Sequence, residues 1–137
     1  MINKIAILSL LVMGISCNSR EEITRQQYVV EGMNLYQTHC ANCHQLDGSG
    51  LKDLYPPLAK TDLWQRVPMN ELACLLKNGQ KDSIRVNGKL FNAYMPGNAK
   101  LQALDIAEIV TYMREKWSSN KTIFSLDSTR FALKNCP

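Results

Sequence analysis

The stretch Cys40-Ala41-Asn42-Cys43-His44 decides the fold of this chain of 137 residues. It has the C-x-x-C-H form that attaches a c-type haem. Two thiols on one turn can add to the two vinyl groups of a single haem, and the adjacent His44 can then offer an imidazole nitrogen to the iron. The stretch therefore predicts one haem, bound covalently through Cys40 and Cys43.

Two other kinds of C-x-x-C site have to be weighed against this one. A thioredoxin-like redox pair is expected beside a βαβ pattern, and the sequence has no such pattern. A zinc site needs a second pair of ligands, whereas Cys74, Cys136 and His39 are scattered along the chain. We therefore prefer haem attachment, and we expect His39 to have no functional role.

The first 16 residues have the pattern of a signal peptide. The apolar run Ile5–Ile15 is too short to span a bilayer, which takes about 20 residues. The end of this run, Gly14–Cys17, resembles the lipobox of bacterial lipoproteins, so we expect export to the periplasm with a lipid on Cys17. Ordinary cleavage that leaves Cys17 as a free thiol is the alternative. Since c-type haem is attached outside the cytoplasm, the export signal and the C-x-x-C-H stretch support each other.

Cysteine use fits an exported protein. Of the five cysteines, one is assigned to the lipid and two to the haem. Cys74 and Cys136 remain, and leftover thiols tend to pair in an oxidising compartment. We expect a disulfide that closes a loop of about 60 residues, worth about 4 kcal/mol on the chain-entropy model. Two buried free thiols are the alternative.

Length and charge narrow the class of protein further. A chain of this length fits one domain, and its 45% hydrophobic content is ordinary for a globular protein. The formal net charge is +4, which falls to about +1 when Lys4 is removed with the signal and two ionised haem propionates are added. This slight basic excess does not indicate a nucleic-acid partner.

The hydrophobic pattern predicts three main helices and one hairpin. Apolar residues at helical spacing indicate the helices, and Asn87-Gly88 is the strongest two-residue hairpin turn. The expected helices are Ile23–His39, Asn70–Asn78 and Gln102–Trp117, with a short fourth helix near Ser128–Leu133 in an otherwise irregular tail, and the expected strands are Ile84–Val86 and Lys89–Phe91.

The order of these features along the chain resembles that of the bacterial monohaem class I c-type cytochromes. The resemblance covers about residues 28–117. It rests on the first helix, the C-x-x-C-H stretch, a Gly-rich turn with a Pro segment, a Met-Pro after the hairpin, and a last helix with aromatic residues. The residues that carry it are Gly32, Tyr36, 40–44, 46–50, 55–58, Met95, Pro96, Tyr112 and Trp117.

The resemblance implies a set of haem-binding residues. Cys40 and Cys43 form the thioether bonds, and His44 is the proximal iron ligand. Met95 looks like the distal ligand, because it is followed by Pro on a loop that can reach the open haem face. Most of the other methionines are explained as targeting or core residues, and Met69 has no loop context that favours iron.

The resemblance also implies supporting contacts. Pro57, with Pro56 as the alternative, resembles the proline whose carbonyl accepts the N–H of the proximal histidine and so orients the ring. Gly32 and Tyr36 resemble the positions where the first helix crosses the last one, near residues 109–113.

The expected architecture is therefore all-α, a class I cytochrome c fold of about three main helices around one covalent haem. We expect a signal peptide at 1–16, a tether at 17–27, the cytochrome domain at 28–117 and an extension at 118–137 pinned by Cys136. The resemblance implies a one-electron carrier rather than an enzyme, since His and Met together saturate the iron. An open-site haem enzyme or gas sensor, and a fixed cytochrome subunit of a larger redox complex, are the alternatives.

By family analogy, the partners are respiratory. They are a quinol-oxidising complex upstream and a terminal oxidase or periplasmic reductase downstream. We expect the protein itself to be a monomer that its lipid holds at a membrane. Basic residues surround the haem-bearing stretch in sequence, either as a rim that steers acidic partners or as plain solvated faces. They are Lys52, Lys60, Lys81, Arg85, Lys89 and Lys100.

Overall fold

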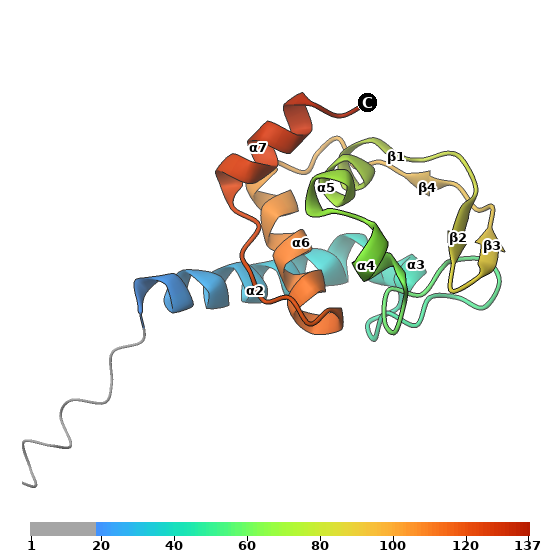
Figure 1. The fold of residues 1–137 in the computed structure, drawn as a ribbon, viewed down its shortest axis with the longest axis horizontal. Helices are drawn as coiled ribbons and strands as arrows, with labels where there is room; N and C mark the ends of the chain where they lie inside the picture. The colour runs from blue at the N-terminus through green and yellow to red at the C-terminus, as the bar shows by residue number, and fades with distance from the viewer. Residues whose placement is uncertain (1–18) are drawn as a thin grey trace, which may run out of the picture.

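The computed structural model describes residues 19–137 as an assembly of helices with two very small sheets (Figure 1). The expected all-α class is thereby confirmed. The signal peptide and the candidate lipidation site Cys17 lie outside the described residues. Within the described part of the chain, no helix is long and apolar enough to cross a membrane.

The elements are α2 (Arg20–His39), α3 (Ala41–His44), α4 (Leu63–Arg66), α5 (Met69–Asn78), β1 (Gly79–Gln80), β2 (Ile84–Val86), β3 (Lys89–Phe91), β4 (Met95–Pro96), α6 (Ala103–Trp117) and α7 (Leu126–Lys134).

Helix α2 begins at Arg20, three residues before the predicted start at Ile23. The reason is a side-chain cap, because the Ser19 hydroxyl accepts a hydrogen bond from the backbone N–H of Glu22 at 3.2 Å. Residues 20–27 of the expected tether are therefore helical. Helix α2 ends at His39, and only Cys40 separates it from α3, so α2 fixes where the C-x-x-C-H stretch lies.

The crossing of α2 and α6 organises the core, at the place that the sequence predicted. Gly32 packs against the backbone of Glu108, and a Cβ atom at Gly32 would lie 2.0 Å from the Glu108 carbonyl oxygen. One turn later, Tyr36 is fully buried, with its ring 5.6 Å from that of Tyr112 and 5.2 Å from that of Trp117. Glycine is required here because the two backbones touch.

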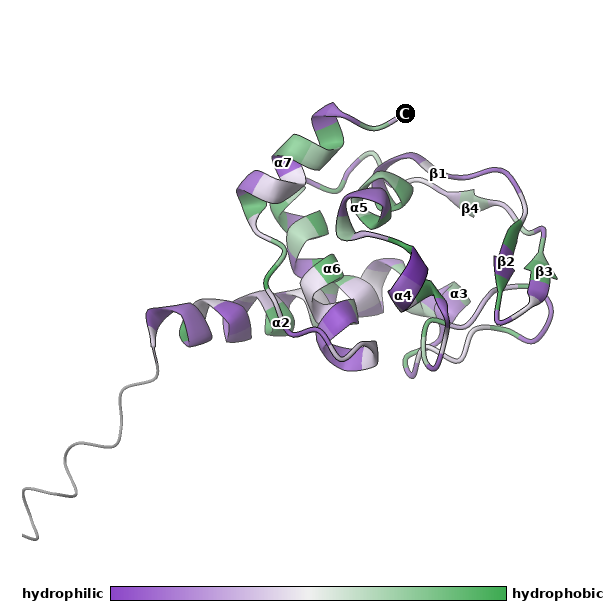
Figure 2. Ribbon diagram, viewed as in Figure 1, coloured by the Kyte–Doolittle hydropathy of each residue, from purple (hydrophilic) through white to green (hydrophobic). Residues whose placement is uncertain are grey.

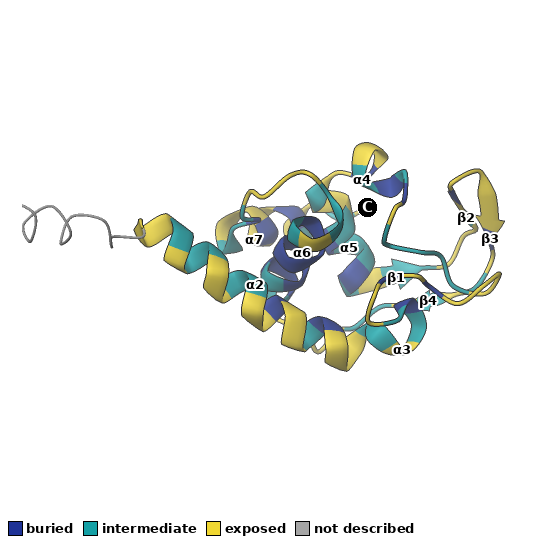
Figure 3. Ribbon diagram, turned by 90° about the horizontal axis from the view of Figure 1, so that it is seen from below, coloured by how far each residue is buried: buried dark blue, intermediate teal, exposed yellow. Residues whose placement is uncertain are grey.

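Helix α6 is the central helix of the fold. It is buried along most of its length, whereas α2 keeps an exposed outer face (Figure 3). The hydropathy colouring agrees, with hydrophobic residues on α5 and α6 and hydrophilic ones on the N-terminal half of α2 (Figure 2). Helix α6 starts after Gln102, whose backbone N–H donates to the Asp105 carboxylate at 2.7 Å in a capping box.

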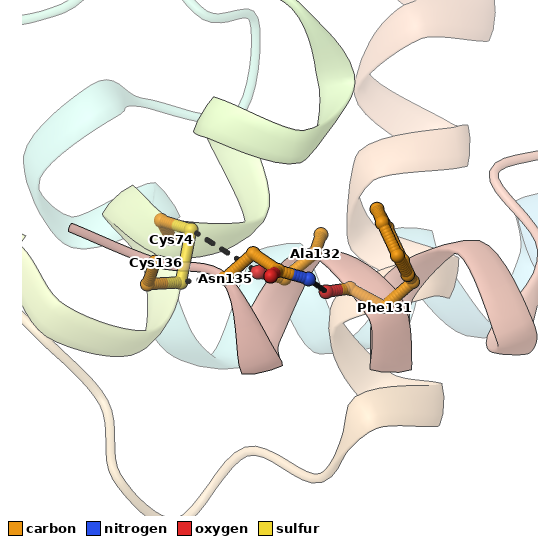
Figure 4. The surroundings of a disulfide bond; sticks show 5 residues. All are labelled: Cys74, Phe131, Ala132, Asn135 and Cys136. Carbon is orange, nitrogen blue, oxygen red and sulfur yellow. Dashed lines mark hydrogen bonds between the residues drawn. A yellow bond between two sulfur atoms is a disulfide. The ribbon is translucent and has the colours of Figure 1, made fainter.

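The tail is more ordered than the sequence indicated. Helix α7 is longer than the predicted helix, because Ser125 caps it by accepting a hydrogen bond from the Ser128 backbone N–H at 3.2 Å. Phe124 and Ala132 are buried, so α7 packs on α5 and α6 and completes their core (Figure 1). A disulfide joins Cys74 to Cys136, the pair that the cysteine count predicted (Figure 4).

Two pairs of antiparallel strands stand beside the helices. Strands β2 and β3 form the predicted hairpin, with Ile84 opposite Phe91. The turn residues Asn87 and Gly88 both have positive φ, as the favoured hairpin turn requires. Strands β1 and β4 form a second pair, in which Gln80 lies opposite Met95. The sequence did not indicate this pair, since two-residue strands carry no periodicity.

Candidate functional site

An apolar cavity, here called the central cavity, opens between α3, α5, α6 and the two strand pairs. It brings together four of the five candidate haem-binding residues that the sequence named. Cys43 and His44 belong to α3, Cys40 is the N-cap of α3, and Met95 belongs to β4. No Lys, Arg, Asp or Glu is among its described lining residues. They are Cys40, Cys43, His44, Tyr55, Pro56, Leu58, Leu63, Leu72, Leu75, Leu76, Gln80, Ile84, Phe91, Ala93, Tyr94, Met95, Pro96 and Met113.

The two thiols are presented by a single helical turn. The backbone N–H groups of Cys43 and His44 both donate to the Cys40 carbonyl, at 3.1 and 3.0 Å. Both thiols are free and partly buried, and burial raises the pKa of Cys40 to about 11, with a smaller contribution from Cys43. A redox C-x-x-C site has a thiol of lowered pKa, so Cys40 does not fit the thioredoxin-like alternative.

A zinc site is not supported either. Within residues 19–137, no group of three or more His, Cys, Asp or Glu side chains lies close enough to hold a metal ion. His39 is exposed, and its nearest polar contact is Asn98, whose amide nitrogen lies 3.4 Å from the ring nitrogen Nδ1. It is not among the residues that line the central cavity.

His44 is prepared to bind a metal through one ring nitrogen. It is 9% exposed, and its Nδ1 lies 3.1 Å from the carbonyl oxygen of Pro56. A carbonyl can only accept, so Nδ1 carries the proton and Nε2 keeps a free lone pair. Burial lowers the pKa of His44, although the Pro56 carbonyl acts in the opposite direction. The imidazole is therefore neutral and able to act as a ligand.

The contact with Pro56 corrects the sequence-based choice of Pro57. Successive carbonyls of an extended Pro-Pro segment point in different directions, and the Pro56 carbonyl is the one that meets the ring. Pro56 also lines the central cavity, whereas Pro57 does not. The residue type and the kind of contact were predicted, but the choice between two adjacent prolines was wrong.

A tight loop holds Pro56 in place. The Gly50 backbone N–H donates to the His44 carbonyl at 3.0 Å. A Cβ atom at Gly50, where φ is +70°, would lie 2.4 Å from the Tyr55 carbonyl oxygen. At the base of the loop, the Leu58 backbone N–H donates to the Gly48 carbonyl at 2.8 Å. These backbone bonds fix the distance between His44 and its carbonyl acceptor without relying on flexible side chains.

Met95 reaches the central cavity from strand β4. Its position is set by backbone packing at the end of α5, where a Cβ atom at Gly79 would lie 2.4 Å from the Met95 carbonyl oxygen. Gly97 on the other side of Pro96 is equally confined. Sequence reasoning did not find the close approach at either glycine, although an isolated glycine is a known sign of close backbone approach. Met113 of α6 also lines the cavity.

The residues of the central cavity fit a covalently bound haem. Two thiols on one turn can take its vinyl groups, a neutral imidazole can take the iron, and leucine and aromatic side chains suit an apolar macrocycle. Imidazole and thioether are also the ligand types that iron accepts in haem proteins. The fold and this site define a class of protein, small helical haem proteins with a single C-x-x-C-H attachment site.

The family follows from sequence comparison. Residues 29–117, which are more than half of the chain, match the sequence model of the family Cytochrome c. The chain therefore belongs to the cytochrome c family, whose members are electron carriers that bind haem c covalently.

Individual relatives agree with this assignment. Cytochrome c-552 of Thermus thermophilus is 29% identical over 96 residues, which cover 68% of this chain and 72% of that protein. The cytochrome c subunit of alcohol dehydrogenase (quinone) from Gluconacetobacter polyoxogenes is 29% identical, over 79% of this chain. The fructose dehydrogenase cytochrome subunit of Gluconobacter japonicus is 27% identical, over 84% of this chain. The matches cover 24% of the length of each of these two subunits.

A solved structure is also similar to this chain. The c-type cytochrome XoxG from Methylobacterium extorquens AM1 is 20% identical, with a TM-score of 0.46. The match covers 80% of this chain and 67% of that one.

The basic residues that the sequence singled out are all exposed. Some have local partners, since Lys89 pairs with Asp53 and the Arg85 guanidinium donates to the Gly88 carbonyl at 2.6 Å. Lys89 and Arg85 belong to the hairpin, and the hairpin contributes Ile84 and Phe91 to the central cavity.

Proposed function

We propose that this chain is a one-electron carrier in which His44 and Met95 are the two axial ligands of the haem iron. The observation that carries the proposal is that both side chains line the same apolar cavity as the two attachment thiols. When bound, the haem supplies one-electron chemistry, with the iron alternating between Fe(II) and Fe(III). Two protein ligands leave no position for a substrate, which favours a carrier over an enzyme or gas sensor.

The residues around the site have separate tasks in this proposal. The Pro56 carbonyl holds the His44 ring in one orientation and raises its basicity as a ligand. Met95 supplies a thioether, which favours Fe(II) and raises the potential. The leucines of α5 and the aromatic residues keep water away from the iron, and a dry surrounding also favours the less charged Fe(II) state.

We further propose that the carrier is exported as a monomer and held at a membrane by a lipid on Cys17. Confinement to a membrane raises its effective concentration toward membrane-bound partners. The proposed partners are a quinol-oxidising complex and a terminal oxidase or periplasmic reductase. Mass spectrometry of the mature N-terminus tests the anchor, and a first residue other than a lipidated Cys17 would contradict it.

Optical spectra of the purified holoprotein test the ligand pair. A charge-transfer band from methionine sulfur to Fe(III), with no spectral change on adding carbon monoxide to the reduced protein, is the expected result. Met95→Leu should abolish the band and admit carbon monoxide, whereas Met113→Leu, at the other methionine of the cavity, should change neither. If Met113→Leu abolishes the band and Met95→Leu leaves it intact, the proposed ligand is wrong. Carbon monoxide binding by the wild type would instead favour an open-site enzyme or sensor.

A second candidate function is favoured by two of the relatives. Both are cytochrome subunits of dehydrogenases, so this chain is alternatively a fixed electron-transfer subunit of such a complex. Purification from native membranes under mild conditions distinguishes the two functions. A stoichiometric complex that survives gel filtration would support the subunit, and an isolated small cytochrome would support the mobile carrier.

A further inference from the structure

The β2–β3 hairpin forms part of the wall of the central cavity, although it cannot be stable by itself. Ile84 and Phe91 of the hairpin line the cavity, and Figure 1 shows the hairpin at the edge of the fold, opposite α7. Each strand has three residues, and in the described part of the chain neither strand pairs with a third one. A two-stranded hairpin is only marginally stable in water. Contacts with the rest of the protein must therefore hold this part of the wall in place.

The turn of the hairpin is joined to the N-terminal end of α4 by a reciprocal pair of hydrogen bonds. The Asp62 backbone N–H donates to the Asn87 side-chain oxygen at 2.9 Å, and the Asn87 backbone N–H donates to the Asp62 carboxylate at 2.9 Å. The Asn87 side-chain amide also donates to the Lys60 carbonyl at 3.0 Å. These bonds, here called the hairpin latch, join residues at least 25 positions apart, so they are not part of the turn itself.

Asparagine is the residue type that meets the needs of both the turn and the hairpin latch. Asn87 has a φ of +49°, a conformation that Asn and Gly adopt more readily than other residues. Glycine would suit the turn equally well, but it has no side chain to bond Asp62 and Lys60. Aspartate would supply an acceptor but no donor for the Lys60 carbonyl. Asn87 thus makes tertiary contacts that the turn alone does not require.

Arg66 of α4 extends the same network to strand β2. Its Nε donates to the second carboxylate oxygen of Asp62 at 3.1 Å, and its Nη2 donates to the Arg85 carbonyl at 2.7 Å. The backbone N–H of Asn87, and Arg66 to a smaller extent, hold the pKa of Asp62 below its ordinary value, although desolvation acts in the opposite direction. The Asp62 carboxylate is therefore ionised near neutral pH and accepts these bonds at full strength.

A small apolar cluster, separate from the main core, lies between the same two pieces of chain. Leu63 and Val67 pack there with Val86 and Phe91 of the hairpin, and Leu63 and Phe91 also line the central cavity. Polar and apolar contacts therefore join residues 60–67 to the hairpin. The first piece follows the loop that carries Pro56, and the hairpin leads into β4. The joined pieces thus form a continuous section of the cavity wall.

We propose that Asp62 and Asn87 are positioning residues that hold the hairpin closed over the haem, and that opening of the hairpin is a route by which water and small ligands reach it. Solvent access to a metal site influences its potential, and exclusion of small molecules prevents side reactions of the iron. The proposal rests on the covalent haem of the family and not on Met95, so it stands or falls separately from the proposed ligand pair.

The first test is hydrogen exchange of the hairpin amides, residues 84–91, in the full-length holoprotein. Asn87→Gly is the main variant, because glycine accepts the positive φ and removes both side-chain bonds of the hairpin latch. Loss of two hydrogen bonds should raise the population of the open hairpin, and so the exchange rate, roughly tenfold. Asp62→Ala removes the other half of the reciprocal pair and should act in the same direction. An unchanged exchange rate in either variant would overturn the proposal.

The second test is the rate at which imidazole binds to the oxidised haem. It is measured in the Met95→Leu background, so that release of the proposed distal ligand does not limit the rate. Asn87→Gly should raise the rate of imidazole binding by the same factor as the rate of hairpin exchange. Faster exchange with unchanged imidazole binding would overturn the proposal, because the hairpin would then open without admitting a ligand.

The matched control is Ser125→Ala on α7. It removes a helix cap, the bond from the Ser128 backbone N–H, and so lowers stability without touching the hairpin. We expect it to leave hairpin exchange and imidazole binding unchanged. An equal rise in Ser125→Ala and Asn87→Gly would overturn the proposal, because general loosening would then explain both.

The same measurements separate this proposal from the proposed ligand pair. If the wild type binds imidazole as fast as Met95→Leu does, Met95 is not the distal ligand. Asn87→Gly, Asp62→Ala and Ser125→Ala are then compared in the wild-type background, with the same expected factor between hairpin exchange and imidazole binding.

Discussion

Substitution of Gly97 by alanine should loosen the proposed distal ligand. A Cβ atom there would lie 2.4 Å from the carbonyl carbon of Asn78 and 2.6 Å from the carbonyl oxygen of Lys77, whereas ordinary contacts begin at 3.4 Å. Both neighbours are backbone at the end of α5, so they cannot rotate away. The segment that carries Met95 must instead move by about 1 Å.

The size of the effect follows from this displacement. Overpacking of a close contact costs about 1–3 kcal/mol, and a shift of about 1 Å is large beside the roughly 0.2 Å tolerance of a metal–ligand distance. If the proposed ligand bond absorbs about 2 kcal/mol of this cost, its closed state becomes roughly thirtyfold less favoured. The reduced variant should therefore bind carbon monoxide far more readily than the wild type, and the oxidised variant should lose charge-transfer intensity.

The matched control is Gly88→Ala in the β2–β3 turn. A Cβ atom at Gly88 meets nothing within 4 Å, but its φ of +78° is unfavourable for alanine. It should lower stability by about 1 kcal/mol and leave carbon monoxide binding as in the wild type. The reasoning is refuted if Gly97→Ala loses stability yet keeps the full charge-transfer band and excludes carbon monoxide.

Three further predictions concern stability. Replacing both cysteines of the disulfide between Cys74 and Cys136, which are 62 positions apart, should cost about 4 kcal/mol in urea unfolding; an unchanged midpoint would mean that the tail packs equally well without it. Gly32→Ala should destabilise by at least about 2 kcal/mol because it separates α2 from α6, whereas Gln37→Ala on the exposed face of α2 should not. Glu108 has its pKa raised to about 7 by burial, then by Glu31 and Asp105. Between about pH 4.5 and about pH 7, the folded protein therefore keeps the Glu108 proton that the unfolded chain loses, and the free energy of unfolding falls as the pH rises. Glu108→Gln should flatten the pH dependence of the melting temperature over that range.

Much of the site could be predicted because its information is local. Cys40, Cys43 and His44 occupy one turn, and their types and spacing indicate haem attachment once the lack of a βαβ pattern and of a second ligand pair sets the alternatives aside. The crossing at Gly32 and Tyr36 was also readable, because a glycine amid helical periodicity signals close approach. The Asn87-Gly88 hairpin followed from the backbone conformation that its two turn residues accept.

The features that were missed depend on how distant segments meet. Pro56 and Pro57 are chemically equal in sequence, and only the path of the loop decides which carbonyl faces His44. The pairing of β1 with β4 needs the end of α5 to meet a segment fifteen residues further along. The burial of Arg114 could not be anticipated, because a basic residue in the last turn of a helix ordinarily faces solvent.

The contact between Gly32 and Glu108 joins two helices that are far apart in the sequence, α2 near the start of the domain and α6 at its end. The two helices are therefore made at different times. Helix α2 emerges from the ribosome long before α6, so it has no partner until nearly all of the domain has been made. Until then the thiols of Cys40 and Cys43 are open to solvent, and burial has not yet raised the pKa of Cys40. Since c-type haem is attached outside the cytoplasm, the thiols of an exported chain are easiest to reach before α6 packs against α2.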